Sequence, residues 1–153
     1  MSGHLVGLFG LYGATLAIAF VAGMFPLVSI EAFLAGYCAL EPVTWPQLVA
    51  LVLLGATGHQ IAKTMCYFAG TTTLEHRRVA AVLERWRPRI DRWNRYPKTM
   101  FFFAASFGIP PMWLVGFIAR PLLAMRFWPF TIAGFWLRAA RYAVISLIPL
   151  LAK

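Results

Sequence analysis

The chain of 153 residues is 61% hydrophobic, 16% aromatic and only 12% charged, whereas a soluble domain is about half apolar and a quarter charged. This composition excludes an ordinary water-soluble globule, and it excludes disorder, which requires low hydrophobicity. The net charge is +9, a balance that would suggest nucleic-acid binding in a soluble protein.

The first 70 residues contain only three charged side chains, and about 20 apolar residues suffice to cross a bilayer as a helix. Pro26 interrupts the first apolar run. Proline removes a backbone donor and clashes with the preceding turn, so a break inside hydrocarbon must be buried in protein or line a cavity. We expect a re-entrant hairpin over residues 8–40, and then a spanning helix opened by Trp45-Pro46.

Basic residues are concentrated between two apolar halves. Eight of the 14 Lys and Arg lie between residues 75 and 98, and the positive-inside rule places such a short loop in the cytoplasm. Its apolar residues recur at helical spacing, which predicts an amphipathic helix lying in the membrane interface. The residues expected at the membrane surface are Arg77, Arg78, Arg85, Arg89, Arg92, Trp86 and Trp93. The expected partners are anionic membrane lipids rather than nucleic acid, although a connecting helix packed on the core would explain the apolar positions equally well.

The second half repeats the pattern of the first. Residues 99–119 form another uncharged run, broken at Pro110 and Pro111, and Trp128-Pro129 opens the last helix. The break and the tryptophan are separated by 18 residues here (128−110) and by 19 in the first half (45−26). Corresponding proline-interrupted segments are typical of inverted-repeat transporters. The competing interpretation makes every apolar run a full span.

The predicted fold class is an all-α polytopic membrane protein, with two opposed re-entrant helical hairpins plus spanning helices in an inverted repeat. One membrane domain, 1–153, comprises a first repeat (1–70), a basic cytoplasmic linker helix (71–98) and a second repeat (99–153). Glycine-rich helix faces would allow close packing within the chain or in a homodimer. The predicted location is the bacterial inner membrane.

Charged residues within apolar segments are the candidate functional residues, because a charge in hydrocarbon costs at least about 2.5–3.5 kcal/mol. Glu31 lies five residues after Pro26 (31−26), near the expected tip of the first hairpin. Alone in a dry site it would be neutral, whereas beside Arg138 or Arg141 it would stay charged. It is therefore a candidate for a proton-responsive carboxylate, and the alternative is a structural ion pair.

Two further pairs share helix faces. His59 and Lys63 are four residues apart, and Arg138 and Arg141 are three apart. Since the guanidinium fork binds phosphate through two hydrogen bonds, these four residues are predicted to bind a lipid phosphate. The alternatives are a lysine that snorkels to the interface and a histidine that is simply a satisfied polar group.

Catalytic and cofactor signatures are missing. The sequence has no GxSxG, HExxH or P-loop, and Cys38 and Cys66 have no partner at metal-ligand spacing. We therefore expect no enzyme activity, no cofactor and no metal.

Three segments together resemble the DedA (SNARE-associated, or VTT-domain) membrane proteins, especially their short branch. They are the segment 25–31 (Phe-Pro-Leu-Val-Ser-Ile-Glu), the Gly55-Ala56-Thr57-Gly58 stretch followed by Lys63, and the segment 134–142. The resemblance implies two opposed re-entrant hairpins, translocation of phospholipids or a polyprenyl-phosphate carrier, a link to the proton motive force, and Glu31 as the acidic residue.

The chain departs from the longer family members in one respect. Many of them carry an arginine pair near the proline of the second hairpin, whereas Ser106 to Trp113 contains no arginine. Either Arg138 and Arg141 replace that pair, or the substrate differs.

The function expected from these observations is lipid translocation or scrambling across the bacterial inner membrane. Two alternatives stay open. One is a membrane-assembly or envelope-maintenance protein that transports nothing, and the other is a proton-coupled transporter of small solutes.

Overall fold

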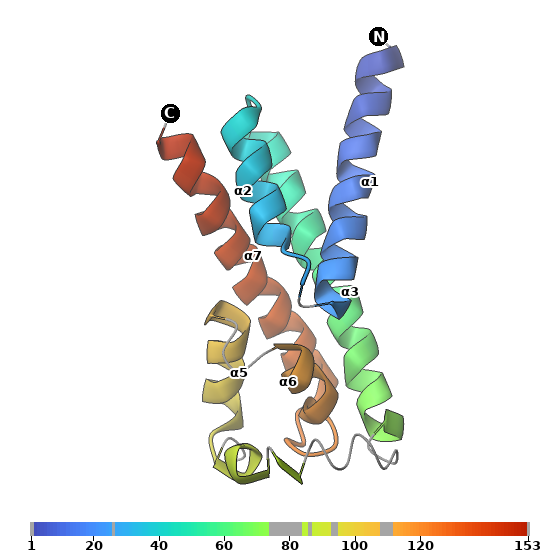
Figure 1. The fold of residues 1–153 in the computed structure, drawn as a ribbon, viewed down its shortest axis with the longest axis vertical. Coiled ribbons are helices and arrows are strands. Elements are labelled where there is room, and N and C mark those ends of the chain that lie inside the picture. Colours follow the sequence, from blue (N-terminus) through green and yellow to red (C-terminus); the bar gives the residue numbers. More distant parts are fainter. Residues whose placement is uncertain are drawn as a thin grey trace. The chain divides into compact units, whose positions relative to one another are not determined.

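The structure is a computed structural model that describes residues 2–25, 27–73, 84–85, 87–92, 95–107 and 112–152. Helices are the only regular secondary structure in these ranges, which confirms the all-α prediction. The principal helices are α1 (Ser2–Met24), α2 (Ile30–Leu40), α3 (Trp45–Thr73), α5 (Pro97–Phe107), α6 (Met112–Ala119) and α7 (Phe127–Leu151) (Figure 1).

The helices form two compact units. Unit 1 comprises Met1–Ala62 and Phe135–Lys153, and unit 2 comprises Lys63–Gly134. Unit 1 therefore joins the beginning of the chain to its end, whereas the predicted repeats, 1–70 and 99–153, follow one another in sequence. The inverted repeat stays a prediction.

Among the described residues, two helices are long and apolar enough to cross a membrane, over Trp45–Gly70 and Phe127–Leu151. Their 26 and 25 residues rise about 38 Å, more than the roughly 30 Å of a hydrocarbon core. α3 begins at Trp45-Pro46, and α7 begins one residue before Trp128-Pro129, close to where the sequence predicts. At the start of α3 the Thr44 backbone N–H donates to Gln47 Oε1 at 3.4 Å.

In unit 1 the first apolar run is divided into two helices. α1 ends at Met24 and α2 begins at Ile30, and α2 returns alongside α1 (Figure 1). Ser29 caps α2, because its Oγ accepts from the Ala32 N–H at 3.2 Å. Pro26, predicted to break the run, lies outside the described residues.

The turn between α1 and α2 lies beside the middle of α3. A Cβ placed on Gly23 would touch Ala62 and the backbone of His59, and one placed on Gly55 would touch Ile30 and Leu34. The core of unit 1 contains buried apolar residues from all four of its helices, namely Ala19, Ala22, Ile30, Leu34, Cys38, Leu48, Leu51, Val52, Ala56, Ala139 and Tyr142.

In unit 2 the uncharged run 99–119 is also divided, into α5 and α6, which pack against each other. Pro110 and Pro111 lie outside the described residues. The Tyr67 hydroxyl donates to the backbone oxygen of Met125 at 2.8 Å. Aromatic rings from α3, α5 and α7 fill the centre of the unit, namely Tyr67, Phe68, Phe101, Phe127 and Phe130.

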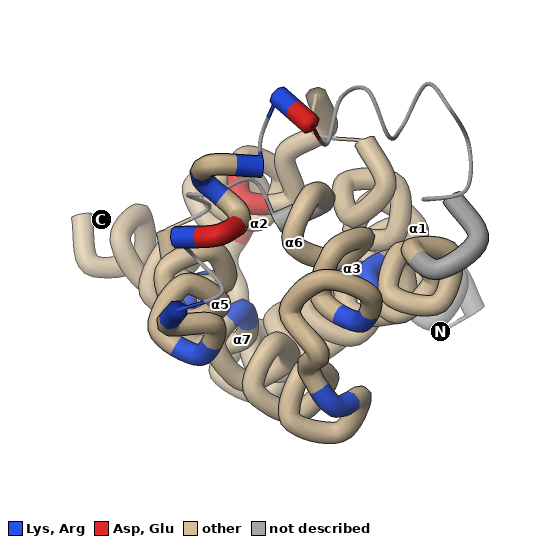
Figure 2. The backbone as a smooth tube through the Cα atoms, turned by 90° about the horizontal axis from the view of Figure 1, so that it is seen from below, with Lys and Arg blue, Asp and Glu red and all other residues tan. Residues whose placement is uncertain are grey.

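The predicted interfacial helix is described only in part. Residues 84–85 and 87–92 are helical, and Lys and Arg cluster along the chain before α5 (Figure 2). Ile90, from the predicted apolar stripe, is buried, whereas the arginines are exposed, as an amphipathic helix requires. The exposed members of the predicted surface set are Arg85, Arg89 and Arg92, and Arg77, Arg78, Trp86 and Trp93 lie outside the described residues.

Candidate functional site

The candidate site is a cluster of polar side chains inside unit 1. The described part of this unit contains four formally charged residues, two acids and two arginines, and Glu41 lies exposed at the end of α2. The other three are Glu31 on α2 and both arginines of α7. Apart from the exposed Glu41, the described part of the unit thus holds one carboxylate and two guanidinium groups, all at most partly exposed.

Glu31 forms an ion pair with Arg141. The distance from Glu31 Oε1 to Arg141 Nη2 is 3.1 Å, and the two side chains are 24% and 31% exposed. Ser29 Oγ donates to the other carboxylate oxygen at 3.0 Å. Glu31 lies in the first turn of α2, where the helix dipole attracts a negatively charged group. The sequence left either arginine open as the partner of Glu31, and the structure selects Arg141.

Arg138 lies deeper and contacts a residue that sequence analysis missed. Its Nη1 donates to Gln60 Oε1 on α3. The two residues are 3% and 6% exposed, so an amide oxygen and a guanidinium meet in the interior of the unit. A hydrogen bond to a charged group contributes more than one between neutral groups, and this bond ties α3 to α7.

Tyr142 and His59 form a second polar link between the same helices. The Tyr142 hydroxyl lies 2.8 Å from His59 Nδ1, and Tyr142 is only 1% exposed. Since Tyr142 follows Arg138 by four residues, the two side chains point from the same face of α7. One face of α7 thus presents both a guanidinium and a phenol to α3.

The structure groups four of the five predicted polar residues in unit 1, namely Glu31, His59, Arg138 and Arg141. Lys63 belongs to unit 2, where it is buried at 2% exposure. Its Cδ lies 3.8 Å from a Cβ placed on Gly116 of α6, so it is packed among neighbours, and the snorkelling alternative is wrong. Lys63 is accordingly described apart from the unit 1 cluster.

Gln60 and Tyr142 are the two cluster residues that sequence reasoning missed. Neither carries a charge, so neither has the insertion cost that singles out a lysine or an arginine. A signal was nevertheless present, because Gln60 adjoins His59 in an apolar helix and Tyr142 is one turn from Arg138.

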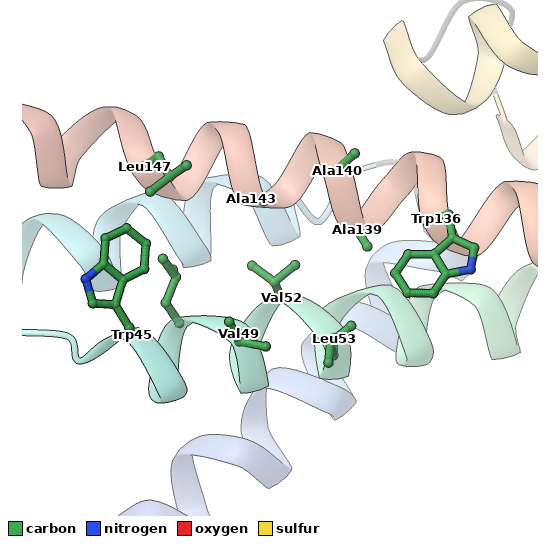
Figure 3. Close-up of a pocket in the computed structure, with 10 residues that line it drawn as sticks. Trp45, Val49, Val52, Leu53, Trp136, Ala139, Ala140, Ala143 and Leu147 are labelled. Carbon is green, nitrogen blue, oxygen red and sulfur yellow. The ribbon is translucent and has the colours of Figure 1, made fainter.

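A groove also runs along unit 1, and it differs from the polar cluster in chemistry. Its volume is about 340 Å³, and Trp45 and Trp136 lie at its two ends (Figure 3). The lining residues come from α3 and α7 and are Trp45, Leu48, Val49, Val52, Leu53, Trp136, Ala139, Ala140, Ala143 and Leu147. This lining suits hydrocarbon and contains no charged side chain.

The described residues contain no group of three His, Cys, Asp or Glu side chains that could hold a metal ion. No family model, curated protein or solved structure matches the chain. The described residues form a helical protein in which two helices are long and apolar enough to span a membrane and an ion pair lies among apolar helices.

Proposed function

We propose that this chain is a multi-pass protein of the bacterial inner membrane that moves a phosphate-bearing lipid, a phospholipid or a polyprenyl phosphate, between leaflets. The observation that carries the proposal is the unit 1 cluster, in which the Glu31–Arg141 pair adjoins a more deeply buried Arg138–Gln60 contact on the same helix. Ionised groups inside membrane segments mark substrate pathways. The resemblance to the short branch of the DedA family supports the same function.

Helix lengths support re-entrant hairpins over full spans. α2, α5 and α6 have 11, 11 and 8 residues, which rise about 16, 16 and 12 Å. Each is shorter than the hydrocarbon core of about 30 Å, whereas the 23 residues of α1 rise about 34 Å. A hairpin that enters and leaves on one side therefore accommodates α2, α5 and α6 better than separate crossings.

The cluster would lower the cost of carrying a phosphate through the bilayer. A charged group pays a large desolvation penalty in hydrocarbon unless it meets a partner there. Two guanidinium groups provide that partner, and one of them is already held by Glu31 at 3.1 Å. An arriving phosphate would bind the other guanidinium, that of Arg138, while Glu31 holds Arg141 in place and the acyl chains stay in the surrounding lipid.

Orientation follows from the exposed arginines before α5. Arg85, Arg89 and Arg92 point away from the protein, and each basic residue near an anionic leaflet contributes about 1 kcal/mol of attraction. In this proposal they lie on the cytoplasmic face.

The test is head-group translocation of a fluorescent phospholipid in reconstituted vesicles. Glu31→Gln keeps the shape of the side chain but removes its charge, and we expect it to slow translocation about tenfold, the effect of losing roughly 1.4 kcal/mol of stabilisation. Glu41→Gln, on the exposed end of the same helix, is the matched control and should move lipid at the wild-type rate.

Three other experimental outcomes would contradict the proposed function, and two of them would indicate a different one. Equal rates for wild type and Glu31→Gln would reject the translocation mechanism. Loss of cellular function on neutralising Arg85, Arg89 and Arg92, with Glu31→Gln unaffected, would indicate an assembly or envelope-maintenance protein. Solute flux that follows an imposed pH gradient, without lipid movement, would indicate a proton-coupled transporter.

A further inference from the structure

Gln60 has a buried hydrogen-bond donor with no acceptor. Its side chain is 6% exposed, and its Nε2 has no hydrogen-bond partner among the described residues. The amide orientation follows from its neighbour, because the Arg138 guanidinium can only donate and must therefore face the amide oxygen. The Nε2–H₂ group is thus left to donate elsewhere, and buried donors without acceptors are rare and costly.

The charges around Gln60 point to an anionic acceptor. The interior of unit 1 holds two arginines and one carboxylate, and Glu31 bonds to Arg141. An anion beside Gln60 would accept from its Nε2–H₂ group, and it would also be attracted to the adjacent positive guanidinium of Arg138. Water would accept from the amide but would carry no negative charge.

We propose that Gln60 Nε2 and the Arg138 guanidinium together bind a phosphate oxygen of the transported lipid, while Arg141 is reserved for Glu31. This inference rests on the proposed function and deepens it, because it assigns the two α7 arginines different tasks. Gln60 is then a specificity-determining residue that contacts the phosphate directly.

The decisive variant is Gln60→Glu. Glutamate has almost the same shape, gives Arg138 a carboxylate partner and replaces the donor by an acceptor that repels anions. The inference predicts a melting temperature at or above that of wild type, together with an affinity for dihexanoyl phosphatidic acid at least about tenfold lower. A purely structural role for Gln60 predicts that affinity follows stability.

Gln47→Glu provides the matched control, because it adds the same charge to the same helix. Glutamate is also favourable at this position in the first turn of α3. Its affinity should equal that of wild type. Gln60→Met, which removes both polar atoms at similar volume, covers the case in which Gln60→Glu does not fold, and it should also lose affinity.

Isothermal titration in detergent micelles would give the affinities, with inorganic phosphate as the second probe. Tighter binding of dihexanoyl phosphatidic acid supports a lipid source for the phosphate. Equal binding of inorganic phosphate supports the same donor pair with free phosphate as its ligand. Wild-type affinity in folded Gln60→Glu, or no binding of either probe to the wild type, overturns the inference.

Failure of this inference can be separated from failure of the proposed function. If Glu31→Gln moves lipid normally but Gln60→Glu loses phosphate affinity, the translocation mechanism fails and the phosphate site stands. If Glu31→Gln stops translocation while Gln60→Glu binds and moves lipid normally, the translocation mechanism stands and the role assigned to Gln60 fails.

Discussion

Packing of α1 on α3 requires glycine at position 58. A Cβ added there would overlap the backbone oxygen of Leu16 and would lie 3.0 Å from Ala19 Cβ and 3.2 Å from the Phe20 nitrogen. Since backbone atoms cannot rotate away, Gly58→Ala must push the two helices apart. Overpacking costs about 1–3 kcal/mol, and the clash with backbone places this case at the upper end.

The helix propensity of alanine offsets part of that cost, because alanine in place of glycine gains about 1 kcal/mol in a helix. The net loss for Gly58→Ala is then about 2 kcal/mol, which lowers the melting temperature by about 4–8 °C for a chain of this length. Gly10→Ala is the matched control, since a Cβ at Gly10 meets nothing within 4 Å. It should leave the melting temperature unchanged or raise it slightly.

Thermal unfolding in detergent micelles, followed by circular dichroism, would measure both variants. If Gly58→Ala melts as high as Gly10→Ala, the close approach of α1 to α3 is wrong. A drop for both variants would contradict the open surroundings of Gly10.

Three further variants test individual contacts by the same melting measurement. Arg141→Gln should destabilise the protein by about 1–2 kcal/mol because it leaves the Glu31 carboxylate without its guanidinium partner. Adding Glu31→Gln should restore part of the lost stability. If the double variant recovers no stability, the two side chains do not form a direct pair. Tyr142→Phe should cost about 1 kcal/mol by removing the hydrogen bond to His59, and an unchanged melting temperature would contradict that bond. Glu84→Gln removes an ion pair between exposed side chains and should shift stability by less than about 0.5 kcal/mol, so a large loss would show a role beyond this surface pair.

The helical architecture was largely predictable from the sequence. The length of each uncharged run indicates a membrane segment. A proline inside a run breaks the helix because it lacks a backbone donor, and the Trp-Pro pairs at Trp45 and Trp128 suit the first turn of a helix. Both long helices accordingly begin at or next to those pairs. The first uncharged run is divided between Met24 and Ile30, and the second between Phe107 and Met112.

The pairing within the cluster was less predictable. Arg138 and Arg141 are about 60° apart around α7, so the rotation of that helix against its neighbours decides which of them meets Glu31. That rotation depends on tertiary packing. Gln60 carries no charge, so the insertion cost that singled out the other residues did not apply to it. His59 and Lys63 share a helix face, and nothing in that spacing predicts that they belong to different compact units.

The proposed function places the start of α2 deep in hydrocarbon and its end near water. Ala32 and Leu40 are both exposed, and the helix rises about 12 Å over the eight residue steps from one to the other (40−32). A spin label placed on Ala32→Cys or Leu40→Cys in reconstituted bilayers, with Cys38 and Cys66 replaced by alanine, reports depth through its relative accessibility to oxygen and to a water-soluble nickel complex. We predict that the label at position 32 lies about 12 Å deeper than the label at position 40. Equal depths, or a label at position 32 that is accessible to the nickel complex, would contradict the location of the ion-pair cluster in hydrocarbon, on which the proposed function depends.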